Sequence, residues 1–125
     1  MTVLAWILSA LLAAAFLAIA ASKLLQPRSK LLTTPNFEYV EDFTAAQIKG
    51  IGVLELLGAL GLVLPALPGI PDVLAPLAAV GLALTMLGAA VVHLRRGERS
   101  RVPANVVLFA LLVTVAILRL GPAPL

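Results

Sequence analysis

Apolar residues dominate four long runs of the chain, and short polar segments separate these runs. They span Thr2 to Ser22, Thr44 to Leu64, Val73 to Leu94 and Pro103 to Leu120. Each holds about 18–22 residues, so a helix rising ~1.5 Å per residue would cover roughly 27–33 Å, the thickness of a bilayer core. No run alternates strictly between apolar and polar residues, which favours helices over barrel strands. The pattern predicts an all-α fold, an integral membrane four-helix transmembrane bundle forming a single domain over residues 1–125.

Composition supports the same class. Hydrophobic residues make up 62% of the chain and charged residues 12%, and the mean hydropathy is +1.10. A soluble domain of this length could not bury so much apolar surface. No basic residue precedes the first run, so we interpret that run as a retained helix rather than a signal peptide.

Basic residues are concentrated in two of the three connections. The third connection contains Arg95, Arg96, Arg99 and Arg101, and the first is flanked by Lys23, Arg28, Lys30 and Lys49. The second connection, Pro65 to Asp72, has none. The positive-inside rule therefore predicts a multi-pass protein of the cell membrane, with the first and third connections cytoplasmic and both termini and the second connection outside. The net charge of +3 then reflects topology and contact with membrane lipid, not nucleic-acid binding.

Several helix ends have recognisable signals. Thr44 and Gln47 fit a capping box at the start of the second helix. The prolines and glycine between residues 65 and 71 predict a tight turn, Asp72 is the predicted N-cap of the third helix, and Pro103 suits the first turn of the fourth. The aromatic residues of the long first connection are expected at the membrane interface.

The residues that are absent narrow the chemistry. The chain has no cysteine and one histidine, which excludes a thiol relay, a cysteine-ligated metal and bis-histidine haem ligation within one chain. Glu55 with His93 alone would make a poor metal site, so we predict none. A redox role would require a bound lipid-soluble molecule or a partner protein to supply the redox group.

Glu55 lies near the middle of the second apolar run. A charged side chain at bilayer depth costs about 2.5–3.5 kcal/mol on insertion scales, and such residues usually mark functional sites. At 100° per residue Glu55 shares a helix side with Gly52, Gly58 and Ala59, whose small size lets a neighbouring helix approach, so we expect Glu55 to face the bundle interior. The alternative to a functional acid is a protonated carboxyl that hydrogen-bonds a neighbouring helix.

Lys49 and His93 are further candidates at a similar predicted depth. Lys49 precedes Glu55 by six positions, about 9 Å along the helix axis, and either snorkels to the headgroups or acts as the counter-ion of an anionic headgroup or ligand. His93 either caps the end of the third helix or serves as a proton shuttle at the mouth of a pocket with Glu55 at its floor.

Two other features lie on the last two helices. Arg119 lies near the outer end of the fourth helix, from which it can snorkel to the headgroups. The small-residue stripe on the third helix is expected to pack against another helix; it consists of Ala78, Gly81, Thr85 and Gly88.

A glycine-rich second helix contains Glu55 and ends at Pro65, the sequence His-Leu-Arg-Arg-Gly-Glu spans residues 93–98, and Arg119 comes near the end of the fourth helix. With these elements the chain resembles the DoxX-like family of small four-helix membrane proteins. Ser22-Lys23-Leu24 also resembles the end of the family's first helix, although the glycine expected before the lysine is absent. The resemblance implies a four-helix bundle. The family takes its name from a subunit associated with a terminal quinol oxidase, and related members are linked to membrane oxidoreductases, but many have no assigned activity.

Three functions remain open at this stage. The first is an accessory subunit that binds a quinone or other lipophilic ligand near Glu55 and works with an oxidoreductase partner or a second copy of the chain. The second is a self-contained enzyme with Glu55 as general acid or base on a lipophilic substrate, and the third is a lipid-binding scaffold without chemistry. The predicted catalytic residues are Glu55 and His93, and the predicted ligand-binding residues are Lys49, Gly52, Gly58 and Arg119.

Overall fold

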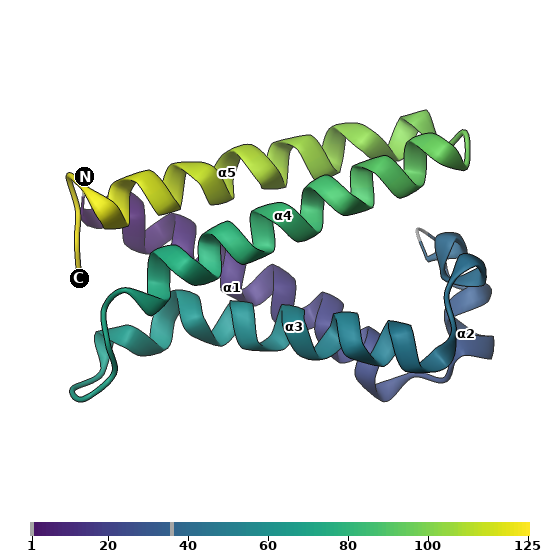
Figure 1. Cartoon of the computed structure of the whole chain (residues 1–125), viewed down its shortest axis with the longest axis horizontal. Coiled ribbons are helices and arrows are strands. Elements are labelled where there is room, and N and C mark those ends of the chain that lie inside the picture. Colours follow the sequence, from purple (N-terminus) through teal and green to yellow (C-terminus); the bar gives the residue numbers. More distant parts are fainter. Residues whose placement is uncertain (1, 36) are drawn as a thin grey trace.

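The computed structural model describes residues 2–35 and 37–125, and Figure 1 shows how their helices are arranged. The long helices are α1 (Thr2–Leu25), α3 (Ala45–Val63), α4 (Leu74–Arg95) and α5 (Val102–Leu120). The short ones are α2 (Arg28–Leu32), η1 (Glu38–Asp42), η2 (Leu64–Ala66) and η3 (Arg99–Arg101). All regular structure in the two described ranges is helical. The predicted all-α bundle is confirmed, and four helical segments are long and apolar enough to cross a membrane.

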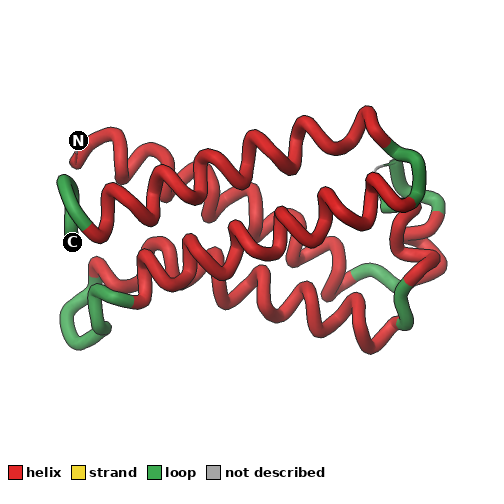
Figure 2. Tube along the Cα trace, turned by 45° about the horizontal axis from the view of Figure 1, so that its top comes forward, coloured by secondary structure: helices red, strands yellow, loops and turns green. Residues whose placement is uncertain are grey.

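The bundle consists of two pairs of neighbouring helices. α1 packs along α3, and α4 packs along α5. Both termini and the turn between α3 and α4 lie at one end of the bundle, here called the terminal end (Figure 2). The opposite end holds α2, η1 and the turn between α4 and α5. The main core lies between these helices and includes Leu12, Phe16, Leu62, Leu82 and Leu112.

Glycine residues of α3 set the closest approach to α4. A Cβ atom added at Gly58 would lie 2.6 Å from the side chain of Leu82, and one added at Gly61 would lie 2.7 Å from Cβ of Ala78. A larger residue at either position would push α4 away, as expected for small residues at a helix crossing. From this crossing α3 and α4 diverge toward the opposite end (Figure 1).

α2 and η1, with the flanking residues Phe37 and Phe43, form a segment across that open end, here called the strap. Leu31, Val40 and Ile48 make a small core that joins the strap to the start of α3. Arg28 donates hydrogen bonds to the carbonyl oxygens of Phe43 at 2.9 Å and Glu41 at 3.0 Å. The small core therefore holds the strap to α3, and the Arg28 side chain joins α2 to the end of η1 within the strap.

The helix ends agree with most of the predicted signals. The capping box of α3 is present: the Gln47 backbone N–H donates to Thr44 Oγ1 at 3.1 Å, and the Thr44 N–H donates to Gln47 Oε1 at 2.9 Å. Gly69 has a φ of +85° in the turn between α3 and α4, a conformation that glycine adopts readily. α1 continues to Leu25 instead of ending at Ser22, which places Lys23 in its last turn.

The predicted N-cap at Asp72 is wrong. Val73 occupies the N-cap position of α4, and no side chain caps this helix. The Asp72 carbonyl oxygen accepts the N–H of Ala75 at 3.1 Å, so a backbone turn leads into the helix. This turn uses the main chain of Asp72 and leaves its side chain exposed.

Candidate functional site

A pocket of about 760 Å³ lies where the helix pairs diverge, and the strap borders it. Its apolar walls include Ile19, Phe37, Phe43, Ile51, Met86, Val92 and Leu108. Its polar lining consists of Lys23, Tyr39, Glu55, Thr85, His93, Ser100, Arg101 and Asn105. The volume is in the range of small-molecule sites, which combine apolar walls with a few polar groups.

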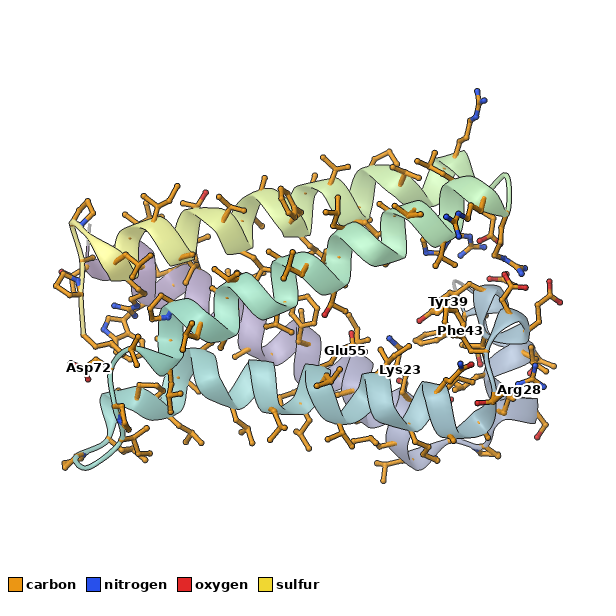
Figure 3. The ribbon with its side chains drawn as sticks, viewed as in Figure 1. Lys23, Arg28, Tyr39, Phe43, Glu55 and Asp72 are labelled. Carbon is orange, nitrogen blue, oxygen red and sulfur yellow. The ribbon has the colours of Figure 1, made fainter. Side chains whose placement is uncertain are left out.

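An ion pair between α1 and α3 lies at the floor of this pocket. Lys23 Nζ donates to Glu55 Oε1 at 2.5 Å, and the two side chains are 7% and 0% exposed. Figure 3 shows them directed toward one another between the helices. Burial of Glu55 inside the bundle is thus confirmed. The carboxyl contacts a neighbouring helix, as the structural alternative requires, but its partner is a lysine ammonium.

Gly52 brings the two halves of this pair together. It lies on the α3 face toward α1, where an added Cβ would come 3.1 Å from Cβ of Lys23 and 3.1 Å from Leu24. Such contacts are tighter than ordinary van der Waals packing, so the missing side chain lets the end of α1 lie close to α3. Gly52 precedes Glu55 by about one helical turn, so this close approach brings Lys23 beside the Glu55 carboxyl.

Tyr39 brings the strap into the site. Its ring lies 5.7 Å from Lys23 Nζ and 5.3 Å from the His93 ring, in an edge-to-face arrangement. Burial raises the pKa of the Tyr39 phenol above its usual value, against the opposing effect of the Lys23 ammonium. Phe37, Tyr39 and Phe43, which the sequence predicts at the membrane interface, line the pocket.

His93, in the last turn of α4, is oriented by an acidic residue of the connection that follows this helix. Its Nδ1 lies 2.8 Å from Glu98 Oε1, and because a carboxylate only accepts, Nδ1–H is the donor. In the neutral imidazole this tautomer leaves Nε2 as an acceptor. The hydrogen bond from His93, together with Arg96, holds the pKa of the Glu98 carboxyl below its usual value.

Arginines at the turn between α4 and α5 hold the strap in place. Arg96 contacts Glu41 at 2.7 Å and Asp42 at 3.0 Å, and Arg101 contacts Glu38 at 3.1 Å. The carboxylates raise the pKa of Arg96 above its usual value, chiefly through hydrogen bonds with Asp42 and Glu41. These contacts link the strap to the helix pair α4 and α5, which follows it in the chain.

The structure brings together only two of the residues predicted for the site. Glu55 and His93 both line the pocket. Lys49 is exposed and donates to the carbonyl oxygen of Leu24 at 2.7 Å, so it caps the end of α1. Gly52 faces α1 and Gly58 faces α4, and both act in helix packing.

Arg119 lies at the terminal end, away from the pocket. It is 4% exposed, donates to the carbonyl oxygen of Ala123 at 3.1 Å and stacks over the Trp6 ring at 4.5 Å. These contacts tie α5 to the C-terminal residues and to α1. In this arrangement Arg119 is buried rather than extended toward headgroups.

The small-residue stripe of α4 packs at only part of its length. Ala78 packs against α3 at Gly61, as predicted. The packing prediction is wrong at Gly81, which is exposed and where an added Cβ would meet no atom within 4 Å. Gly88 lies beyond the point where the helices diverge: an added Cβ would meet no atom within 4 Å, and the residue lines the pocket. The packing interpretation is therefore wrong at Gly88, because α3 has moved away from α4 at that depth.

Comparison with known proteins assigns the chain to a family. The model of the DoxX-like family matches residues 7–115. The chain belongs to the DoxX-like family. The matched stretch contains Lys23, Tyr39, Glu55 and His93, whereas Arg119 lies beyond it. Neither a curated protein nor a solved structure matches this chain.

Two site residues of this DoxX-like protein were not among the predicted ones. By sequence alone Lys23 is a basic residue that flanks a connection, although Ser22-Lys23-Leu24 resembles the end of the family's first helix. Tyr39 stands in an acidic, aromatic segment whose path cannot be inferred from a helical period. The lysine could have been found by asking which basic residue is near enough to a helix end to pair with Glu55.

Proposed function

We propose that this DoxX-like membrane protein binds a lipophilic small molecule, with a quinone as the leading class, in the pocket floored by Lys23 and Glu55. We further propose that it serves as an accessory subunit of a membrane oxidoreductase. The observation that carries the first proposal is a buried ion pair facing an apolar pocket. The family resemblance supports the second.

The division of the pocket into apolar walls and a polar floor matches an amphiphilic ligand. Side chains such as Ile19, Met86 and Leu108 would contact its hydrocarbon part. Glu55 would hydrogen-bond its headgroup or exchange a proton with it. Tyr39 and His93, whose rings are in contact, would carry that proton from the headgroup toward the strap.

Native mass spectrometry with lipid extraction tests this proposal on gently solubilised wild type and Glu55→Gln. We expect one specific lipophile bound stoichiometrically to wild type and depleted at least several-fold in the variant. The melting temperatures of both proteins, measured in the same detergent, show whether the variant remains folded. An identical mixture of bulk lipids in two folded proteins would overturn the proposal and favour a scaffold.

A second candidate function is catalysis by the chain alone. A carboxyl, an ammonium, a phenol and an imidazole line one pocket, and such groups perform general acid–base chemistry on a lipophilic substrate. The identity of the extracted molecule separates the two functions. A quinone would support the redox role, whereas an isomerisable, hydrolysable or cyclisable lipid that the purified protein converts would support catalysis.

A further inference from the structure

The two oxygens of the Glu55 carboxyl have different surroundings. Oε1 accepts the hydrogen bond from Lys23, but Oε2 is buried and has no hydrogen-bond partner in the part of the chain that the structure describes. A buried acceptor without a donor is unfavourable, and native structures almost always satisfy such groups. Glu55 also lines the pocket. A ligand in the pocket can therefore supply the donor that the protein does not.

The charges around the pocket restrict the kind of donor. Lys23 is paired with Glu55 and Arg101 with Glu38, and the His93 ring is hydrogen-bonded to Glu98. An anionic ligand would bring a negative group against Oε2, and a cationic ligand would bring a positive group beside the Lys23 ammonium. A neutral O–H group satisfies Oε2 without either repulsion.

The volume and the apolar walls of the pocket determine which hydrocarbon part the ligand can have. Its volume of about 760 Å³ and its wall residues, such as Ile51, Met86 and Val92, suit a ring or a branched hydrocarbon. The aromatic residues of the strap, Phe37 and Phe43, lie on another side of the same pocket.

We propose that the pocket selects a neutral lipophile bearing a hydroxyl group, an alcohol or a phenol, whose O–H donates to Glu55 Oε2. This inference rests on the proposed ligand-binding function and adds the chemical class. It gives Glu55 a specificity-determining role: the hydroxyl form of a ligand binds more tightly than the corresponding ether or carbonyl form. Within the quinone class, the reduced quinol is therefore the form that donates to Oε2.

A matched pair of probes tests the selection. Binding of para-nonylphenol and of its methyl ether, para-nonylanisole, is measured on the wild-type protein in nanodiscs, with empty nanodiscs subtracted. We expect the phenol to bind about tenfold more tightly, the ratio that corresponds to one hydrogen bond. Para-nonylbenzoate, which is anionic, is expected to bind more weakly than the phenol.

Two variants locate the hydrogen bond. Lys23→Met/Glu55→Met replaces the buried pair with apolar side chains of similar length, an exchange that buried ion pairs often tolerate, and is expected to lower the phenol-to-ether ratio to about twofold or less. Thr114→Val is the control. It removes a hydroxyl of α5 that is not among the pocket-lining residues and donates within its own helix to the carbonyl oxygen of Ala110 at 2.8 Å, and it is expected to keep the wild-type ratio.

The outcomes separate this inference from the proposed function. Equal binding of phenol and ether to wild type would overturn the selection but leave the ligand pocket. A preference that persisted in the folded double variant would overturn it too, because another group would then hold the hydroxyl. Failure of every probe to bind would overturn both. The phenol-to-ether binding ratio of the wild type tests the selection for a hydroxyl group even where the double variant does not fold.

Discussion

Lys23 and Glu55 place opposite charges inside the bundle, where each charge alone would be costly. Desolvation of one unpaired ion costs several kcal/mol, and its partner recovers this only at short distance. The separation of 2.5 Å and the near-complete burial of both side chains meet that condition. At the residue scale the pair is thus a structural unit as well as the floor of the pocket.

The first prediction concerns the removal of one half of this pair. Lys23→Met leaves a buried carboxylate unpaired, and we expect a loss of about 3 kcal/mol in the free energy of unfolding. Lys23→Met/Glu55→Met should recover most of this loss, because both charges are then absent. Thermal melts of the three proteins in one detergent measure the effect. A single variant as stable as wild type would show that the pair contributes little.

Ionisation of the Tyr39 phenol is expected to lower the stability of the folded protein at alkaline pH. Burial raises the pKa of its phenol above the usual 10.0, so the folded protein holds this proton more tightly than the unfolded chain does. The stabilising contribution is therefore complete below about pH 10 and is lost as the pH rises through the folded-state value. Lys23, Glu55 and His93 face the same phenol. All three are unchanged in a variant that alters Tyr39 alone.

Tyr39→Phe is the matched control, since it keeps the ring and removes the ionisable group. We expect the melting temperature of wild type to fall more steeply above pH 10 than that of the variant. Superimposable pH profiles of melting temperature would contradict a role for Tyr39 ionisation.

At the scale of elements, some glycines lie where two helices pack closely, and others lie where no neighbouring helix contacts them. Gly52 of α3 admits α1, while Gly58 and Gly61 of the same helix admit α4. α4 carries Gly81 and Gly88 two turns apart, and a Cβ added at either would have no atom within 4 Å. Of these two glycines only Gly88 lines the pocket.

This difference yields a matched pair of variants. Gly88→Leu is expected to fill part of the pocket and to weaken binding of the proposed lipophilic ligand at least fivefold, on the scale of a lost apolar contact. Gly81→Leu should leave binding unchanged. Both proteins should melt within a few degrees of wild type, because neither residue has packed neighbours to displace and leucine favours the helix. Equal ligand retention in both variants would place the ligand elsewhere.

At the scale of the whole molecule, the charged residues gather at the end of the bundle that carries the strap. Arg96 and Arg101 join the strap there through Glu38, Glu41 and Asp42. The terminal end has a short turn rich in proline instead. By the positive-inside rule this asymmetry predicts that the strap end is cytoplasmic.

Cysteine labelling tests that orientation directly, because the chain has no cysteine of its own. Asp72→Cys is expected to react with a membrane-impermeant maleimide added to intact cells, and Ser100→Cys only after the membrane is opened. The two positions are exposed and lie in the turns at opposite ends of α4. Labelling in the reverse order would invert the topology.

Much of the fold could be predicted because it depends on local properties. Apolar run lengths, the capping box at Thr44 and the small face around Glu55 are written in neighbouring residues, and the structure has all three. The site could be predicted only in part. Glu55 and His93 are conspicuous in an apolar chain, whereas Lys23 and Tyr39 resemble ordinary residues of a connection.

The sequence by itself determined the membrane class, the four helices and the burial of Glu55, since hydrophobic period and length act along one segment. Tertiary structure alone decided which residues complete the site. The pairing of Lys23 with Glu55 joins residues 32 positions apart, and the angle between the helix pairs decides that Gly88 meets a pocket instead of a helix. Such contacts depend on how whole helices pack and on where the strap folds back, which no single segment specifies.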